Sequence, residues 1–156
     1  MDKQIISIDS PTDFIVGKYV SSDELKQYMN APYKIKAGVF ILCMEGYIRT
    51  TINQSEYTST RHHVTTLIPN SYLQIHEMSE EILIYFVAFS SDFMGYVNFV
   101  RSTMNCLSVI YKNPVIPISQ EMSCLFATFY DLLFQYAIYP NILNNKEMIK
   151  AIFTMC

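Results

Sequence analysis

Three histidines are the first candidates for chemistry, because an imidazole can bind a metal or transfer a proton near neutral pH. His62 and His63 are neighbours that flank a turn, with Arg61 before them. Adjacent residues on a strand point to opposite faces, so this pair cannot easily bind one ion together. We interpret His62 and His63 as surface or turn residues and predict no metal site there.

The third histidine, His76, shares a face with other polar residues. Alternation along a short strand predicted at residues 73–76 places Tyr72, Gln74 and His76 on one side. If this side faces the inside of a barrel, the three residues would line a small-molecule site, with polar tips on an apolar wall. In the alternative, Tyr72 and Gln74 lie at the mouth of the barrel, and His76 is an ordinary hydrogen-bonded histidine.

Arg49 and Tyr47 are further candidates for contact with a ligand. They lie on the face of the alternating segment 47–53 that is opposite Ile48 and Ile52. A cation inside a barrel would suit a carboxylate or sugar ligand. Because Arg is seldom buried without a partner, the sequence favours an outward position for Arg49 and Tyr47.

The cysteines indicate no catalytic or redox centre. Cys43, Cys106, Cys124 and Cys156 form no CxxC pair and lie within apolar runs, which favours buried, reduced thiols in a cytoplasmic protein over disulfides. No Ser/His/Asp or Cys/His combination stands out, and there is no Walker loop or GxGxxG motif. We therefore expect no catalytic residue, no cofactor and no enzyme activity.

Composition limits the partners of the chain. Its 156 residues fit one domain, 51% are hydrophobic, and the net charge is −3. The eleven basic residues are scattered, whereas a DNA-binding domain gathers Lys and Arg on one face. The N-terminus has no apolar signal region, and no stretch reaches the length of a membrane span. We expect a cytoplasmic protein that does not bind nucleic acid through these residues.

Short strands are predicted along the first part of the chain. They cover residues 13–20, 34–44, 47–53, 56–60, 64–68, 73–76 and 82–89, with a short helix or turn at 21–24. The last strand, ILIYFVAF, is apolar throughout and is predicted to be buried on both faces. Regular spacing with turn residues between strands indicates an antiparallel sandwich or barrel from about Lys34 to Phe89.

Helices are predicted after the barrel. Ser91-Asp92 can cap a helix over residues 93–104, Pro114 and Pro117 mark an extended connector, and Ser119 caps a long helix to residue 139. Asn144 and Glu147 resemble a capping box for a last helix, which reaches Cys156 without a stop signal. We interpret this ending as a chain truncated before a further domain.

The long helix is apolar on more than one side and carries only Glu121 and Asp131 as charges. The barrel can cover one side only, so we predict a homodimer interface along the helix. The residues predicted for this interface are Met122, Phe126, Phe129, Leu133 and Tyr136.

The order of features between Gly38 and Phe99 resembles the cupin-type N-terminal domain of AraC-family transcription regulators. A strand ends in Met44-Glu45-Gly46, a hairpin centres on Asn53-Gln54, and a strand stops at Pro69. A short strand (QIH) and a strand ending in Phe89-Ser90 follow. A glycine turn, a strand ending in Pro, a short strand and an IxFS strand occur in that order in the family, and dimerising helices follow its barrel. The resemblance covers about two-thirds of the chain.

The resemblance implies a mainly β fold with an α-helical C-terminal part: a cupin-like (jelly-roll) antiparallel β-barrel followed by helices. Residues 1–113 would form the barrel, with an N-terminal arm and a helix after the last strand, and residues 114–156 a helical dimerisation segment. The implied function is ligand sensing and dimerisation, with a homodimer and a small-molecule effector as partners. DNA would be bound only by a helix-turn-helix domain after Cys156.

The resemblance also bears on metal binding. Metal-binding cupins use two His and a Glu from one motif and a further His from a second. In this sequence Val39 stands where the Glu is expected, Gln74 stands at the second-motif His, and the strand before Gly46 has no His. A transition metal needs three or four converging ligands, so we predict no metal.

Two other functions compete with the sensing domain. One is a metal-free cupin enzyme, which would need His, Glu or Tyr converging in the lumen. The other is a barrel without catalysis: a stand-alone small-molecule-binding barrel, or one that has lost its ligand and serves only for dimerisation. Large aromatic side chains filling the lumen would favour the loss of the ligand.

Overall fold

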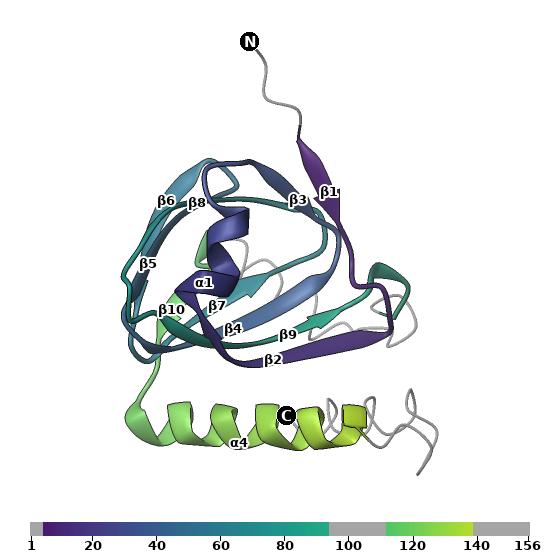
Figure 1. Ribbon diagram of the computed structural model, residues 1–156, viewed down its shortest axis with the longest axis vertical. Helices are drawn as coiled ribbons and strands as arrows, with labels where there is room; N and C mark the ends of the chain where they lie inside the picture. Colours follow the sequence, from purple (N-terminus) through teal and green to yellow (C-terminus); the bar gives the residue numbers. More distant parts are fainter. Residues whose placement is uncertain (1–4, 94–111, 139–156) are drawn as a thin grey trace.

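The computed structural model describes residues 5–93 and 112–138. It contains two five-stranded sheets, a short helical segment and one long helix (Figure 1). The elements are β1 (Ile6–Ile8), β2 (Phe14–Ser21), α1 (Ser22–Leu25), η1 (Lys26–Tyr28), β3 (Tyr33–Ile35), β4 (Gly38–Glu45), β5 (Tyr47–Ile52), β6 (Ser55–Thr60), β7 (His63–Leu67), β8 (Ser71–Met78), β9 (Leu83–Phe89), β10 (Val115–Pro117) and α4 (Gln120–Ile138).

The strand pairings define a jelly roll. Four nested antiparallel pairs, β2 with β9, β3 with β8, β4 with β7 and β5 with β6, form one long ribbon that is wound into a barrel. The result is an outer sheet, β1-β3-β8-β5-β6, and a helix-side sheet, β10-β7-β4-β9-β2. Eight strands in this arrangement are the jelly-roll fold that cupins share. The predicted fold class, a cupin-like barrel followed by a helix, is confirmed.

Two tight connections set the register of the central strands. Asn53 and Gln54 both have positive φ (48° and 80°), as the two-residue hairpin between β5 and β6 requires. Gly46, between β4 and β5, has a φ of 80°, and a Cβ there would lie 2.3 Å from Ser79 Oγ. Only glycine fits this turn, so Gly46 fixes where β4 ends and β5 begins.

The helix α4 lies flat against the outside of the helix-side sheet (Figure 1). Alternation along β4 and β9 turns Leu42, Tyr85, Val87 and Phe89 toward the helix, where they form one buried cluster with α4. Ser119 Oγ accepts a hydrogen bond from the Met122 N–H at 3.1 Å, so the predicted cap is confirmed. Both faces of this sheet are covered, which explains the apolar texture of β9.

The predicted elements need four corrections. The strand predicted at 34–44 is two strands, β3 and β4, which belong to different sheets. The strand predicted at 73–76 is longer, from Ser71 to Met78. β1 pairs in parallel with β3, and the predicted connector contains β10, which pairs with β7; both three-residue strands were missed. The helices predicted over 93–104 and from Asn145 lie almost entirely outside the described residues, and the division into 1–113 and 114–156 stays a prediction.

Candidate ligand-binding site

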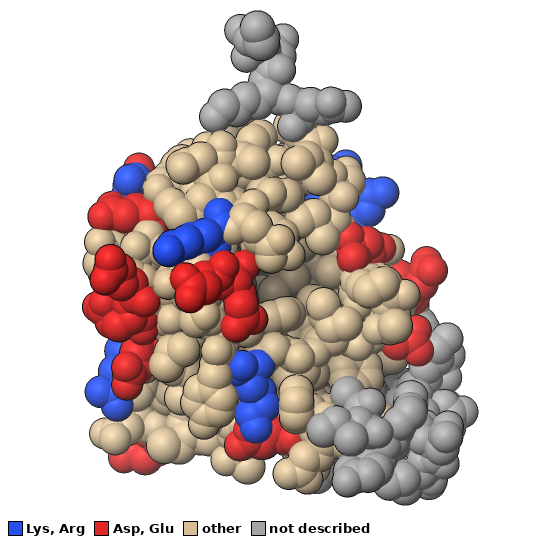
Figure 2. Space-filling view, viewed as in Figure 1, with Lys and Arg blue, Asp and Glu red and all other residues tan. Residues whose placement is uncertain are grey.

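The barrel contains a cavity of about 240 Å³ between its two sheets. Fourteen of its twenty-one lining residues are aliphatic or Phe. Leu25 and Tyr28, from α1 and η1, and the segment Ile8–Ser10 also line the cavity. Figure 2 shows a hollow near the middle of the viewed face of the molecule. A concave, mostly apolar space with few polar groups is the usual form of a small-molecule site.

The helix-side sheet supplies one wall of the cavity. Val39 and Ile41 of β4 and Ile84, Phe86 and Ala88 of β9 line it. These residues alternate with those that pack under α4. One layer of backbone therefore separates the cavity from the helix.

Three small hydroxyl residues form the polar part of the barrel wall. Thr50 of β5, Ser59 of β6 and Thr65 of β7 all line the cavity, and each is more than nine-tenths buried. Within the described ranges 5–93 and 112–138, their hydroxyls make no side-chain hydrogen bond. Buried polar groups usually have a partner, so these hydroxyls can serve a molecule in the cavity.

Asp9 is the one carboxylate among the lining residues of the described chain. Its oxygens accept hydrogen bonds from the Ser91 N–H at 3.1 Å, the Ser91 hydroxyl at 2.6 Å and the Ser10 N–H at 2.8 Å. Burial raises the pKa of Asp9, but these hydrogen bonds together with Lys36 outweigh it, and the pKa is lowered. Asp9 is therefore charged at neutral pH and already engaged with the chain.

The five predicted ligand contacts do not line this cavity. Tyr72, Gln74 and His76 alternate on β8 with Leu73 and Ile75, and it is Leu73 and Ile75 that face the lumen. The interpretation in which the polar face of β8 lines the lumen is therefore wrong. Tyr72 is 45% exposed and borders a shallow depression with Asn53, Gln54 and Asn70.

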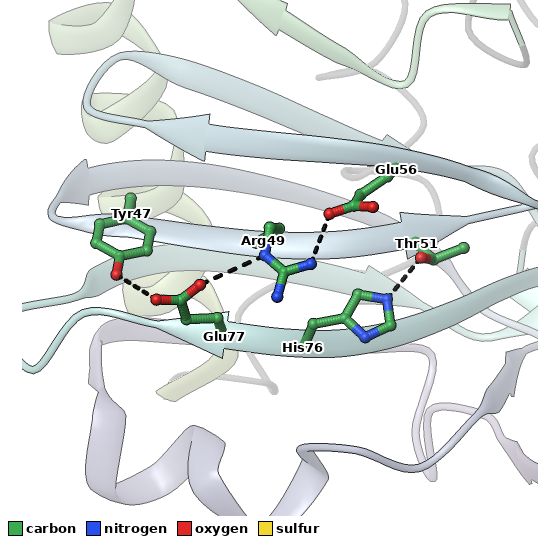
Figure 3. Close-up of polar contacts among 6 residues, drawn as sticks. All are labelled: Tyr47, Arg49, Thr51, Glu56, His76 and Glu77. Carbon is green, nitrogen blue, oxygen red and sulfur yellow. Dashed lines mark hydrogen bonds and ion pairs between the residues drawn. The ribbon is translucent and has the colours of Figure 1, made fainter.

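Tyr47 and Arg49 also lie outside the barrel, in a polar network on the outer sheet (Figure 3). The Tyr47 hydroxyl donates to Glu77 at 2.8 Å, and Arg49 pairs with both Glu77 and Glu56. The hydrogen bond to Glu77 raises the pKa of Tyr47, and bonds from Tyr47 and then Arg49 lower the pKa of Glu77. The predicted outward position of Arg49 and Tyr47 is confirmed.

His76 is an ordinary hydrogen-bonded residue on the same outer surface. Its Nε2 lies 2.6 Å from the Thr51 hydroxyl (Figure 3). His63 Nδ1 interacts with Thr60 at the β6–β7 turn, where His62 has a positive φ of 66°. Within the described residues no three His, Cys, Asp or Glu side chains are grouped to hold a metal. The absence of a bound metal stays a prediction.

The thiols differ in their surroundings. Cys43 is buried, and this burial raises the pKa of its thiol to about 11. Cys124 is exposed on α4, so the prediction of a buried thiol is wrong at this position. Cys106 and Cys156 lie outside the described residues.

The apolar stripe predicted for a dimer interface packs mostly against the barrel. Leu133 and Tyr136 are buried, and Phe126 and Phe129 are half-buried against the same cluster. Only Met122 of the five is exposed. The outer face of α4 instead presents Leu125 and Leu132, which are 61% and 49% exposed. Because this face is also apolar, the helical pattern did not distinguish its two sides.

Polar contacts fix α4 to the barrel. The Tyr130 hydroxyl donates to the Phe40 carbonyl at 3.0 Å. Lys18 Nζ lies 2.6 Å from Asp131 Oδ1 and 5.1 Å from the centre of the Phe134 ring. Lys18 extends from a bulge in β2, where the register with β9 shifts between Gly17 and Val20.

No family model matches the chain, and no curated protein matches it. Among solved structures, ToxT K231A from Vibrio cholerae aligns with 94% of this chain and 55% of its own, at 13% identity and a TM-score of 0.49. The EutQ protein of Clostridium difficile aligns over 51% and 55%, at 9% identity and a TM-score of 0.33. The chain thus spans about half of each of these proteins, and the fold assignment rests on the strand pairings above.

In the described residues, no helix is both long enough and apolar enough to span a membrane.

Proposed function

We propose that this chain is the ligand-sensing and dimerisation domain of an AraC-type bacterial transcription regulator that acts in the cytoplasm. The observation that carries the proposal is the helix-side sheet, which has an apolar cavity on one face and α4 on the other. The order of sequence features between Gly38 and Phe99 supports the same class. A helix-turn-helix domain outside these 156 residues would bind the DNA.

Sensing needs a physical link between the cavity and the helix. A ligand shifts an equilibrium only if it binds two arrangements of the protein with different affinity. A molecule that moves Phe86 or Ile41 displaces the backbone of β9 or β4, and the neighbouring residues on these strands contact α4. Occupancy of the cavity would thereby change the position of α4 on the sheet.

Dimerisation would use the outer face of α4 with a second copy of the chain. Met122, Leu125 and Leu132 are exposed there, on a helix about 28 Å long at 1.5 Å per residue. Asp131 is already paired with Lys18. Leaving large apolar side chains in water forgoes roughly 1.5–3 kcal/mol each, which a symmetric helix pair would recover.

Sedimentation of the purified chain tests the dimer. We expect a dimer at micromolar concentration and a folded monomer after Leu125→Glu with Leu132→Glu. Ser55→Glu with Thr58→Glu, two exposed polar positions of β6 away from α4, is the matched control and should leave the dimer intact. An unmodified chain that sediments as a monomer would contradict the proposal.

A reporter assay tests regulation. The chain is fused to a monomeric DNA-binding domain whose operator is occupied only by dimers. We expect operator occupancy that Leu125→Glu with Leu132→Glu abolishes and that cavity filling through Ala88→Phe changes. Equal occupancy for the unmodified chain and both variants would refute the sensing role.

We also propose that the chain is not an enzyme. The titratable side chains that line the cavity, among the described residues, are Asp9, Tyr28 and Tyr33. Asp9 is held by Ser91 and Ser10, so no free acid–base pair is arranged around the lumen. The competing function, a stand-alone small-molecule-binding barrel, shares the cavity but gives the outer face of α4 no role; the sedimentation test distinguishes the two.

A further inference from the structure

The cavity has an apolar body and three hydroxyls on one side. Ser59 of β6 lies opposite Ile48 of β5, and Thr50 is two residues along β5, on the same face. β6 and β7 are joined by the turn Arg61-His62 and carry Ser59 and Thr65. The hydroxyls therefore come from three consecutive strands, whereas the remaining lining of the two sheets is aliphatic except for Tyr33 and Phe86.

The charge of the lining excludes most ions. No Lys, Arg or His lines the cavity among the described residues, and Asp9 places a negative charge at its edge. Transfer of a carboxylate or phosphate into such a space without a paired cation is strongly unfavourable. A cation gains little from Asp9, because Ser91 and Ser10 already occupy its oxygens.

The size and polarity of the cavity further limit the class of ligand that it can bind. A cavity of about 150 Å³ lined by Leu, Ile and Phe holds benzene, so the 240 Å³ here accommodates a larger molecule. A sugar would bury many hydroxyls against aliphatic side chains and leave most of them without partners. A molecule with one polar group can satisfy both the aliphatic lining and the three hydroxyls.

We propose that the cavity binds a neutral, largely apolar molecule with one hydrogen-bonding group, which contacts Thr50, Ser59 and Thr65. This inference names the class of ligand that the cavity binds. It depends on the proposed function only in assigning that ligand a role in regulation. The hydroxyl or carbonyl of the ligand replaces the partners that these three side chains lack.

Decanol and decanoate are the probes that test the proposal. They share a chain and differ in the charge of the head group at neutral pH. Calorimetry with the purified 156-residue chain, below the concentration at which either probe aggregates, should show one decanol per chain and at least roughly tenfold weaker decanoate binding. Decanoate binding that equals or exceeds decanol binding would overturn the neutral class, as would no decanol binding at its solubility limit.

Variants locate the probe and its polar contact. Ala88→Phe fills the cavity and should abolish decanol binding. Thr65→Val should weaken decanol binding by roughly three- to tenfold, the effect of one neutral hydrogen bond, while raising the melting temperature without ligand, since a buried hydroxyl is removed. Thr58→Val, at an exposed position of β6, is the matched control and should change neither decanol binding nor the melting temperature. Unaltered decanol affinity in both Thr65→Val and Ser59→Ala would overturn the assigned contact.

These results are separable from the regulatory role. Decanol binding that leaves the dimer and α4 unchanged would support the ligand class and contradict sensing. A dimer that fails to bind decanol would overturn the ligand class and leave dimerisation standing.

Discussion

The two sheets of this barrel share a cavity but differ in what lies behind them. The helix-side sheet is covered by α4 and packs Leu42, Val87 and Phe89 on its far face. Among the described residues no helix covers the outer sheet, whose outer face carries the Tyr47–Glu77–Arg49–Glu56 network (Figure 3). One sheet therefore has the cavity on one face and a helix on the other, whereas the other sheet carries polar surface residues on its outer face.

The distribution of aromatic side chains follows the same difference. Phe14, Phe40, Phe89 and Phe93 belong to the cluster under α4, and Phe86 is the one Phe that lines the cavity among the described residues. Most of the described Phe side chains therefore lie at the helix–sheet interface, and the lumen, which Tyr28, Tyr33 and Phe86 also line, keeps a space of about 240 Å³. This arrangement argues against a barrel that has lost its ligand.

The largest effect on the free energy of unfolding is expected where α4 covers the helix-side sheet. Leu133→Ala removes a fully buried side chain of α4 and should lower the free energy of unfolding by about 2–5 kcal/mol. Leu132→Ala, at a 49% exposed position, is the control and should change it by about 0.5 kcal/mol or less in the monomer. Urea unfolding measures both. Equal losses would show that α4 does not bury one face as described.

A smaller effect is expected where β2 touches the cavity wall. A Cβ on Gly17 would lie 2.1 Å from Phe86 Cε1, so Gly17→Ala forces the Phe86 ring to move. We expect a loss of roughly 1–3 kcal/mol and weaker decanol binding, because the ring moves into the lumen. Adding Phe86→Leu should recover part of the stability in thermal melts. No recovery would place the strain elsewhere.

The ion pair between β2 and α4 should contribute less. Lys18→Met and Asp131→Asn each remove the pair, which is partly exposed, so the expected loss is about 0.2–1 kcal/mol. The double variant should lose little more than either single variant in a double-mutant cycle. Strictly additive losses would mean that Lys18 and Asp131 act independently of each other.

The smallest effect is expected in the network of the outer sheet. The pKa of Glu77 lies below its ordinary 4.5 because of hydrogen bonds from Tyr47 and Arg49. A lowered pKa in the folded state stabilises the fold above the ordinary value, and this contribution is lost as pH falls through the folded value. Glu77→Gln should therefore flatten the decline in melting temperature below pH 4.5. An unchanged acid profile would show that this exposed network does not stabilise the sheet.

Sequence patterns predicted the elements whose position depends on their own residues rather than on a distant partner. The β5–β6 hairpin follows from Asn53-Gln54, and the start of α4 from Ser119. β1 and β10 were missed because a three-residue strand is defined by its partner, β3 or β7, and no local pattern reveals that partner.

The site was harder to predict than the fold. Alternation on β8 separated Tyr72 and His76 from Leu73 and Ile75, but it did not show which pair faces inward. The apolar pair does, because apolar side chains gain more from burial than polar ones. Thr65 was missed because it lies within a β-branched run and looks like any strand residue. The stripe on α4 was assigned to a partner because both of its faces are apolar.

Hydrogen exchange of α4 tests the central claim, that the helix-side sheet couples the cavity to the helix. No α4 residue lines the cavity, so exchange at residues 120–138 responds to a bound molecule only through the sheet. Saturation with decanol should change amide protection along α4, and Ala88→Phe, which blocks the cavity, should remove the decanol response. Bound decanol with unchanged exchange along α4 would contradict the coupling.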